Sequence, residues 1–204
     1  MSQGNPASRE TRDYLDNIKK QGHGSVLEHA SYSLLLEGVS RSLTHELVRH
    51  RAGFAYSQLS QRYVDESHAA FVVPPAVAGN AALEQTWREQ IESAQSTYIA
   101  LVEKLMEQYG WVTDKIHRRK MAREAARGVL PNSTETKIVV TANARAWRTM
   151  LELRSSEGAE LEIRRCAVAC LRLLAAEAPG FFSDFEIYVA TDRQEAARVS
   201  FHKV

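Results

Sequence analysis

Residues 83–109 carry the longest regular pattern in the chain, with apolar side chains recurring at the spacing of one helix face. Tyr98, Leu101 and Leu105 belong to this apolar stripe. Such a stripe predicts a long amphipathic helix whose apolar face packs on other elements. Residues 112–127 follow as a second helical stretch that is rich in Lys and Arg. Most of the fold is therefore expected to be helical.

Helical spacing recurs on both sides of this pair, at residues 8–21, 40–51, 144–154 and 159–177. Ser8 is expected to cap the first of these helices. Strand-like alternation or β-branched runs occupy three short segments, residues 30–38, 134–141 and 185–189. These patterns indicate an α+β protein, mostly helical, with a small central sheet. We expect one domain over residues 1–204, because this length suits a single sizeable core.

Composition limits what the chain can bind. The net charge is +1, which gives no global signature of polyanion binding, so nucleic acid is not an expected partner. The longest apolar runs are too short to span a bilayer, and the N-terminus lacks the basic-then-apolar pattern of a signal peptide. We therefore expect a cytoplasmic protein with no membrane partner.

Cys166 and Cys170, the two cysteines, lie four residues apart in an apolar helical pattern. This spacing places them on one helix face, where the geometry does not favour a disulfide. No His or other Cys lies nearby in the sequence to complete a metal site. We expect buried thiols, a reducing compartment and no metal.

Residues 49–63 combine fixed cations, hydrogen-bonding side chains and aromatic rings more densely than any other stretch. Forked guanidinium donors that suit phosphate and ring carbonyls come from Arg49, Arg51 and Arg62. The side chains suited to the polar edge of a ring are Ser57, Gln58, Ser60 and Gln61. The rings that offer stacking faces are those of Phe54, Tyr56 and Tyr63. Together they favour a nucleotide ligand, although a basic last turn also occurs simply to complement a helix dipole.

The segment 46–63 resembles the signature of the flavin-dependent thymidylate synthases, in which Arg-His-Arg is followed by a spacer, a Ser and then x-Arg-Tyr. Further segments resemble that family in the same order, at residues 22–29, 126–131, 143–145 and 153–154. Residues from about 12 to 190 can be laid along the family, and several separated motifs in one order are more specific than any single motif.

The resemblance implies an enzyme that reductively methylates dUMP to dTMP without a protein nucleophile. FAD would be the flavin, NADPH its source of electrons and methylene-tetrahydrofolate the carbon donor. A fixed guanidinium can stabilise the negative charge that builds on the uracil ring. The family typically forms homotetramers whose sites are shared between subunits, so the implied partners are a small-molecule nucleotide and further copies of the chain.

Individual roles follow from the resemblance position by position. The implied flavin contacts are Ser25, Arg49, His50, Arg51, Gln58, Asn143, Arg145 and Thr149. The implied dUMP contacts are Glu46, Arg49, Gln58, Ser60, Gln61, Arg62, Arg127 and Arg154. Arg154 would be the catalytic, substrate-activating residue, and His29 and Tyr63 would lie near the folate.

The chain departs from the family pattern at several places. Eight residues separate Arg51 from Ser60, where the family usually has seven, so the added residue near Gly53 is expected to bulge the loop or move the Ser-Gln-Arg edge. Gly158 stands where the family often has His, and Thr149 where it often has a larger polar residue. The family also carries an N-terminal strand and a flavin-contacting segment that we expect to be missing here, which leaves the strength of flavin retention open.

Other interpretations stay open beside this one. A homologue of the same fold would act on another pyrimidine nucleotide, such as UMP. A non-catalytic nucleotide- or RNA-binding module would use residues 49–62 and 115–127 as a basic patch. That basic helix is also typical of a solvated face, of a subunit interface or of the approach of the pyridine nucleotide. Glu46, finally, suits an ion pair with Arg49 or His50 nearby on its helix.

Overall fold

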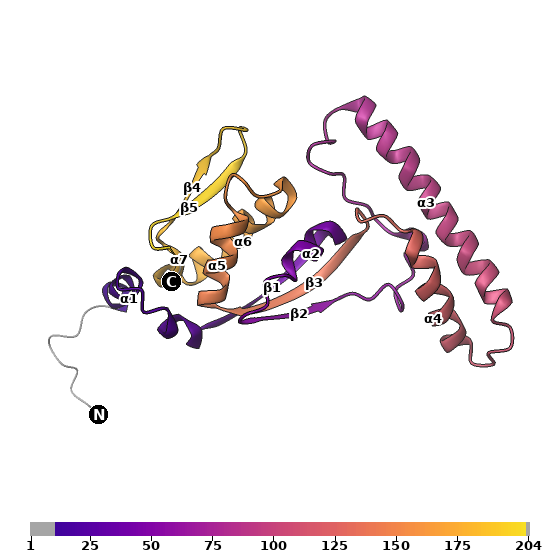
Figure 1. Ribbon diagram of the computed structural model, residues 1–204, viewed down its shortest axis with the longest axis horizontal. Helices are drawn as coiled ribbons and strands as arrows, with labels where there is room; N and C mark the ends of the chain where they lie inside the picture. Colours follow the sequence, from indigo (N-terminus) through magenta and orange to yellow (C-terminus); the bar gives the residue numbers. More distant parts are fainter. Residues whose placement is uncertain (1–10, 203–204) are drawn as a thin grey trace. The chain divides into compact units, whose positions relative to one another are not determined.

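The computed structural model describes residues 11–202, and Figure 1 labels the helices and strands. The chain forms two compact units. Unit 1 consists of the described residues of Met1–Leu34, Arg49–Ala55 and Val140–Val204, and unit 2 of Leu35–Val48 and Tyr56–Val139. The expectation of a single domain stays a prediction, and the cap expected at Ser8 lies outside the described residues.

Unit 1 contains the fully buried side chain of Trp147 in its core. Its helical segments are α1 (Thr11–Lys20), η1 (Gly24–His29), α5 (Ala144–Arg154), α6 (Leu161–Glu177) and α7 (Pro179–Phe182). Its hairpin is formed by β4 (Phe185–Val189) and β5 (Glu195–Val199), which pair antiparallel. Trp147 is fully buried, and its indole Nε1 donates to the carbonyl of Tyr32 over 3.1 Å. This contact anchors α5, the helix that carries the candidate site.

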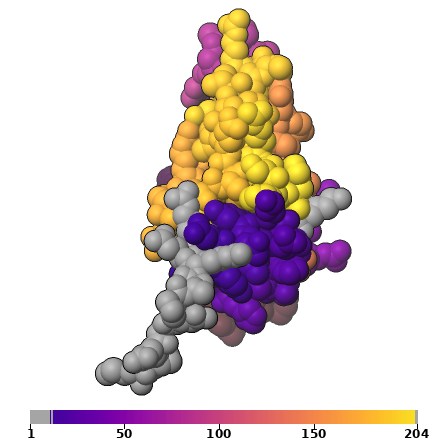
Figure 2. All heavy atoms as spheres, turned by 90° about the vertical axis from the view of Figure 1, so that its left-hand side faces the viewer, coloured from indigo at the N-terminus to yellow at the C-terminus, as the bar shows by residue number. Residues whose placement is uncertain are grey.

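Within unit 1, helix α1 contacts the segment that leads into the β4–β5 hairpin. Figure 2 shows the indigo residues of α1 and η1 beside the yellow residues of the β4–β5 hairpin. Lys19 on α1 is buried there and pairs with Asp184, which directly precedes β4, at 3.2 Å. The same carboxylate receives a hydrogen bond of 2.6 Å from Arg148 on α5. One buried carboxylate therefore joins three elements of the unit.

Unit 2 is dominated by a helical hairpin. Its helical segments are α2 (Arg41–Leu47), η2 (Glu66–His68), α3 (Ala81–Gln108), α4 (Lys115–Ala126) and η3 (Arg127–Val129). α3 and α4 pack side by side and are joined by a short turn (Figure 1). Arg118 closes this turn, because its Nε donates to the carbonyl of Val112 over 2.8 Å. Asp114 caps α4 by accepting from the backbone N–H of Ile116 over 2.9 Å.

A three-stranded sheet has the order β1 (Ser31–Ser40), β3 (Glu135–Asn143), β2 (Phe54–Gln58). The central strand β3 alternates as a strand should, and its buried side chains are Thr136, Ile138, Val140 and Ala142. The expected α+β class, mostly helical with a small sheet, is confirmed. Within residues 11–202, no helix combines the length and the apolar composition needed to cross a membrane.

Two expectations for the segment after residue 40 are wrong. The helix expected over residues 40–51 ends at Leu47, because the hydroxyl of Tyr56 donates to the Leu47 carbonyl over 2.9 Å and satisfies the helix end. The loop expected after residue 51 contains the strand β2, which runs alongside β3 until the N–H of Leu59 donates to the carbonyl of Lys137 over 3.0 Å. The first difference arises from a contact across nine residues, and the second from pairing with a strand that is distant in sequence.

Candidate functional site

A cleft of about 430 Å³ opens in unit 1 beside the Arg-His-Arg segment. Its walls come from η1, from the turn that follows His50, and from the first turns of α5. Its lining residues are Glu28, His50, Arg51, Ala52, Gly53, Phe54, Asn143, Arg145, Ala146 and Thr149. A second hollow of about 260 Å³ shares Glu28, Gly53, Phe54 and Asn143 with the cleft and adds the hydroxyls of Ser31 and Thr141. The two hollows therefore adjoin.

The turn that forms one wall of the cleft requires glycine at position 53. The N–H of Phe54 donates to the carbonyl of Arg51 over 3.3 Å, and only Gly53, at φ +75°, has a positive φ within the turn. This is a type II turn, which favours glycine at its third position. A Cβ on Gly53 would lie 2.8 Å from the Cβ of Ala146 and 3.0 Å from Nδ2 of Asn143. Residues 51–54 thus form a tight turn directly ahead of β2.

The opposite wall is the N-terminus of α5. The side-chain oxygen of Asn143 accepts from the N–H of Ala146 over 2.8 Å and caps this 11-residue helix. The positive end of the helix dipole therefore borders the cleft, together with the guanidinium groups of Arg51 and Arg145. Arg145 is half-exposed and pairs with Glu28 at 2.6 Å. Helix N-termini and forked guanidinium donors are the groups that bind phosphate.

The last residue of α5 reaches back to the Arg-His-Arg segment. Nε of Arg154 donates to Nε2 of His50 over 2.9 Å, so this imidazole nitrogen acts as the acceptor. Burial, and then the positive charge of Arg154, lower the pKa of His50 below its ordinary value of 6.5. The imidazole also packs near Phe54, with ring centroids 6.0 Å apart. Arg154 is therefore oriented by a group that is neutral at physiological pH.

The structure brings several of the predicted site residues together in one region. Five of the eight residues expected to contact flavin line the cleft: His50, Arg51, Asn143, Arg145 and Thr149. Ser25, Arg49 and Gln58 are not among its described lining residues. Ser25 and the folate-proximal candidate His29 lie exposed on η1, and Arg49 is exposed just before the turn. The roles of these residues stay predictions.

Most of the residues expected to bind dUMP belong to unit 2. Glu46 is half-buried on α2, and the amide of Gln58 donates to the hydroxyls of Thr44 and Thr136 over 3.1 and 3.3 Å. Gln58 also lines a separate hollow of about 320 Å³ in this unit. Arg127 is half-buried at the end of α4.

The remaining candidates follow β2 in one short segment. The Ser60 hydroxyl accepts from the N–H of Arg62 over 3.4 Å, and Gln61 is buried. The guanidinium of Arg62 approaches Glu124 at 3.9 Å and the ring of Tyr63 at 5.7 Å. Tyr63 itself is exposed. These residues share one unit, and their substrate roles stay predictions.

Residues that the sequence analysis missed also border the cleft. Glu28 pairs with Arg145, and Ser31 and Thr141 line the adjoining hollow. Glu28 directly precedes His29 in the segment that carries the resemblance, but nothing in the local sequence indicates its contact with a residue 117 positions away. Ser31 carries no signal beyond its place at the start of a strand.

The fold and the cleft define an α+β protein whose cleft is bordered by a helix N-terminus and two arginines, groups that suit phosphate. Comparison with known proteins narrows this class. The family described as "thymidylate synthase complementing protein" matches residues 1–180. The chain is 51% identical over 196 residues to a flavin-dependent thymidylate synthase of Mycobacterium tuberculosis, with 96% of this chain and 78% of the relative covered.

Two further relatives are also flavin-dependent thymidylate synthases. The chain is 50% identical over 202 residues to a flavin-dependent thymidylate synthase of Mycobacterium sp. (strain JLS), and 49% identical over 196 residues to one of Mycobacteroides abscessus. Both comparisons cover 96% of this chain and 78% of the relative. The chain belongs to the flavin-dependent thymidylate synthase family and is an enzyme of that family.

Proposed function

We propose that this enzyme converts dUMP to dTMP by reductive methylation, with FAD as its flavin, NADPH as the reductant and methylene-tetrahydrofolate as the carbon donor. The observation that carries the proposal is the contact of Arg154 with His50 beside a cleft lined by arginines and a helix N-terminus. The family to which the chain belongs supports the reaction, because its curated relatives are flavin-dependent thymidylate synthases.

The residues of the cleft suit a flavin dinucleotide. Arg51, Arg145 and the capped N-terminus of α5 together form a donor set for a diphosphate. The ring of Phe54 is half-buried in the cleft wall and lies 5.6 Å from Trp147 in an edge-to-face arrangement, which holds it rigidly. When bound and reduced, the flavin supplies the reducing electrons. We assign the remaining flavin contacts to Ser25, Arg49, His50, Gln58, Asn143 and Thr149.

Arg154 is the residue that activates the substrate. Its Nε donates to His50, and we assign its guanidinium group to a pyrimidine oxygen and nitrogen of the substrate. His50 orients the guanidinium without cancelling its charge, because the imidazole is neutral, whereas a carboxylate in the same place would neutralise it. A positioned donor of this kind lowers the barrier by about 3–4 kcal/mol. The charge that develops on the uracil ring thus meets a cation with a fixed direction.

The reaction needs no protein nucleophile in this proposal. Cys170 is buried on α6, and Cys166 beside it is only partly exposed. A hydrogen bond from Cys170 lowers the pKa of Cys166, so the position of the thiols, and not their acidity, argues against a cysteine nucleophile. Neither cysteine is among the lining residues of the cleft. Ser60 serves as a substrate contact.

The proposal also includes the substrate and folate contacts and the oligomeric state. Substrate contacts are assigned to Glu46, Arg49, Gln58, Ser60, Gln61, Arg62 and Arg127, and folate contacts to His29 and Tyr63. We infer a cytoplasmic homotetramer with sites shared between subunits and with neither nucleic acid nor membrane as a partner. Trp111 and Ile116 support assembly, because these large apolar side chains are exposed at the end of the α3–α4 hairpin.

Tritium release tests the reaction and the substrate together. The purified chain is incubated with FAD, NADPH, methylene-tetrahydrofolate and either dUMP or UMP labelled at carbon five. We expect release from dUMP that needs all three additions, with little release from UMP. Faster release from UMP would transfer the assignment to another pyrimidine nucleotide. Co-purifying nucleic acid, with no release from either nucleotide, would favour an RNA-binding module.

A further inference from the structure

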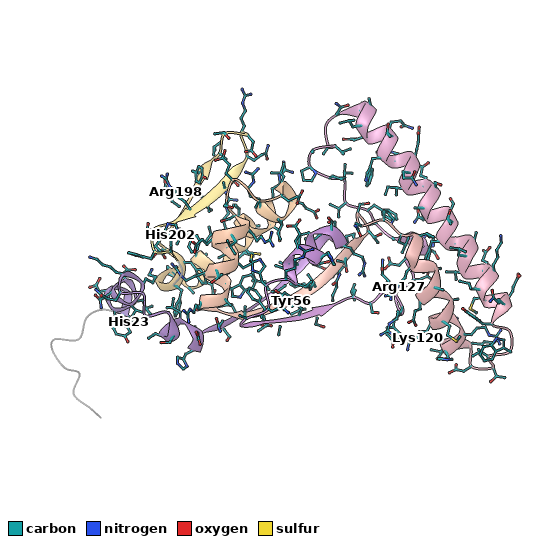
Figure 3. All side chains as sticks on the ribbon, in the orientation of Figure 1. His23, Tyr56, Lys120, Arg127, Arg198 and His202 are labelled. Atoms are coloured by element: carbon teal, nitrogen blue, oxygen red, sulfur yellow. The ribbon has the colours of Figure 1, made fainter. Side chains whose placement is uncertain are left out.

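The loop that follows Arg154 is bonded to the β4–β5 hairpin, within unit 1. Ser155 ends α5 and is fully buried, and its hydroxyl donates to the carbonyl of Leu151 over 2.6 Å. Its own carbonyl accepts from the N–H of Ala197 on β5 over 2.8 Å. The next residue of that strand is Arg198, which Figure 3 labels on the hairpin. The end of α5 is therefore attached to the hairpin directly after Arg154.

Glu157 attaches the middle of this loop to the turn of the hairpin. Its carboxylate accepts from the backbone N–H of Thr191 over 3.0 Å and from the hydroxyl of the same residue. These two hydrogen bonds lower the pKa of the Glu157 carboxyl, so the group is ionised and accepts strongly at neutral pH. The next residue is Gly158, which has no side chain to add, so Glu157 carries the contact with the turn.

Arg164 holds the same loop through its backbone. It lies on α6 with only 2% of its surface exposed, and its Nη1 donates to the carbonyl of Glu157 over 3.1 Å. Its Nη2 pairs with the carboxylate of Asp192, the residue after Thr191. Asp192 also accepts from the N–H of Gln194 over 3.0 Å, which fixes the carboxylate in the hairpin turn. A buried cation thus joins the loop, α6 and the hairpin, and we call Glu157, Arg164 and Asp192 the loop clamp.

We propose that the loop clamp positions the guanidinium group of Arg154, whose Nε donates to His50. Its consequence for catalysis rests on the proposed function, which assigns substrate activation to Arg154. Arg154 is the last residue of α5, and the last carbonyl groups of a helix lack partners inside the helix. The direction of this side chain therefore depends on what holds the loop that follows. No clamp residue is among the described lining residues of the cleft, so the clamp acts through Arg154.

Asp192→Asn tests the clamp, with Glu195→Gln as its matched control. Both residues are exposed hairpin carboxylates paired with an arginine of α6, but of the two only Asp192 pairs with the arginine that also holds the Glu157 carbonyl. Glu157→Ala and Glu157→Gln form a second pair, since glutamine keeps an oxygen to which Thr191 can donate. NMR gives the pKa of His50 in each variant without turnover, steady-state kinetics gives kcat and KM for dUMP, and urea unfolding checks that each variant is folded.

We expect the two disrupting variants, Asp192→Asn and Glu157→Ala, to raise the pKa of His50. The guanidinium charge that lowers this pKa would no longer be held beside the imidazole. Glu157→Gln and Glu195→Gln should keep the wild-type value. In the disrupting variants kcat should fall by about tenfold while KM for dUMP changes by less than about twofold, because a misplaced group that acts in the transition state mainly lowers kcat.

The same substitutions in an Arg154→Ala background decide whether the clamp acts through Arg154. They should cause no further change in the pKa of His50 there, because the charge is already absent. The proposal would be overturned by an unchanged pKa in both disrupting variants, by an equal rise in Glu195→Gln, or by a rise that persists in the Arg154→Ala background. Variants with the expected pKa values, together with a wild type that does not turn over dUMP, would contradict the proposed function and still support the positioning role.

Discussion

Arg154 and His50 form the pair on which the proposed chemistry depends. The two residues are 104 positions apart, yet Nε of Arg154 lies 2.9 Å from Nε2 of His50. This contact leaves the charge of the arginine in place, because the acceptor nitrogen of the imidazole carries no charge. The imidazole, in turn, is kept neutral by burial and by the arginine. The neutral imidazole therefore orients the guanidinium group, and the guanidinium group in turn favours the neutral form of the imidazole.

Arg154→Ala should abolish most turnover while leaving flavin binding intact. Removing a positioned donor for developing negative charge typically lowers kcat by about 10²–10³-fold. Arg154→Lys should recover only part of this, because an ammonium lacks the planar fork. Steady-state kinetics and flavin fluorescence titration measure the two effects separately. Normal turnover in the alanine variant would remove the activation role from Arg154.

The titration of His50 should respond to Arg154. We expect NMR to give a pKa below 6.5 in the wild type, since burial is the larger cause and the arginine the second. In Arg154→Ala the pKa should rise but stay below 6.5, because burial remains. A folded pKa below the unfolded one means that the unfolded chain takes up the proton first, so stability falls as pH drops through about 6.5. An unchanged pKa in the variant would contradict the contact.

At the scale of elements, the type II turn and α5 meet at Gly53. The carbonyl of Gly53 accepts from the N–H of Asn143 over 3.3 Å, and Asn143 is the residue that caps α5. The same junction holds Arg51 on one side of the cleft and Arg145 on the other. The width of the cleft therefore depends on how closely the turn approaches the helix.

Gly53→Ala tests this junction, with Gly79→Ala as its matched control. Both glycines have positive φ, but an added Cβ meets nothing within 4 Å at Gly79. Each substitution should lower the free energy of unfolding by about 1–2 kcal/mol through backbone strain. Only Gly53→Ala should also weaken FAD binding, by about tenfold, since Asn143 and Ala146 must move. Equal FAD affinity in the two variants would show that the turn does not determine the width of the cleft.

The ion pairs around Asp184 join α1, α5 and the start of β4 within unit 1. Lys19 and Arg148 are almost completely buried, and both contact this carboxylate. Burial alone would raise the pKa of Asp184, but hydrogen bonds and charge from Arg148 and then Lys19 outweigh it and lower the pKa. The stability that this group contributes is thus present above its ordinary pKa of 3.8 and is lost as pH falls through the lower folded value.

Asp184→Asn should therefore lower the free energy of unfolding by about 3–5 kcal/mol at neutral pH, because buried Arg148 loses this counter-charge and Lys19 keeps only its pair with Asp16. Glu186→Gln is the control, since Glu186 pairs with Arg198 on the exposed hairpin surface and should matter by less than about 1 kcal/mol. Urea unfolding followed by circular dichroism measures both variants. The acid-induced loss of stability should also be smaller in Asp184→Asn. Equal effects of the two substitutions would contradict the buried network.

At the scale of the whole molecule, long periodic segments were predictable from sequence and short paired ones were not. The helix expected over residues 144–154 is α5 as observed, because its apolar face and its Asn143 cap are local signals. β2 and β5 were not predicted. Each strand has five residues. β2 pairs with β3 and β5 pairs with β4, so pairing with the neighbouring strand stabilises each one more than its own sequence does.

Five residues that line the cleft were predicted from the sequence. The resemblance of several motifs in one order indicated His50, Arg51, Asn143, Arg145 and Thr149. A Cβ on Gly53 would lie 2.8 Å from the Cβ of Ala146, and this close approach depends on how the turn packs on α5. Such packing is a property of tertiary structure and has no signal in a single segment.

Flavin titration of the purified chain is the most direct measurement of the central claim, that arginines and a helix N-terminus hold a flavin beside Arg154. The account predicts a yellow complex with saturable, stoichiometric binding of FAD, and weaker binding of FMN, which lacks the diphosphate that Arg51 and Arg145 would hold. A chain that stays colourless and takes up neither flavin at any concentration would contradict the account.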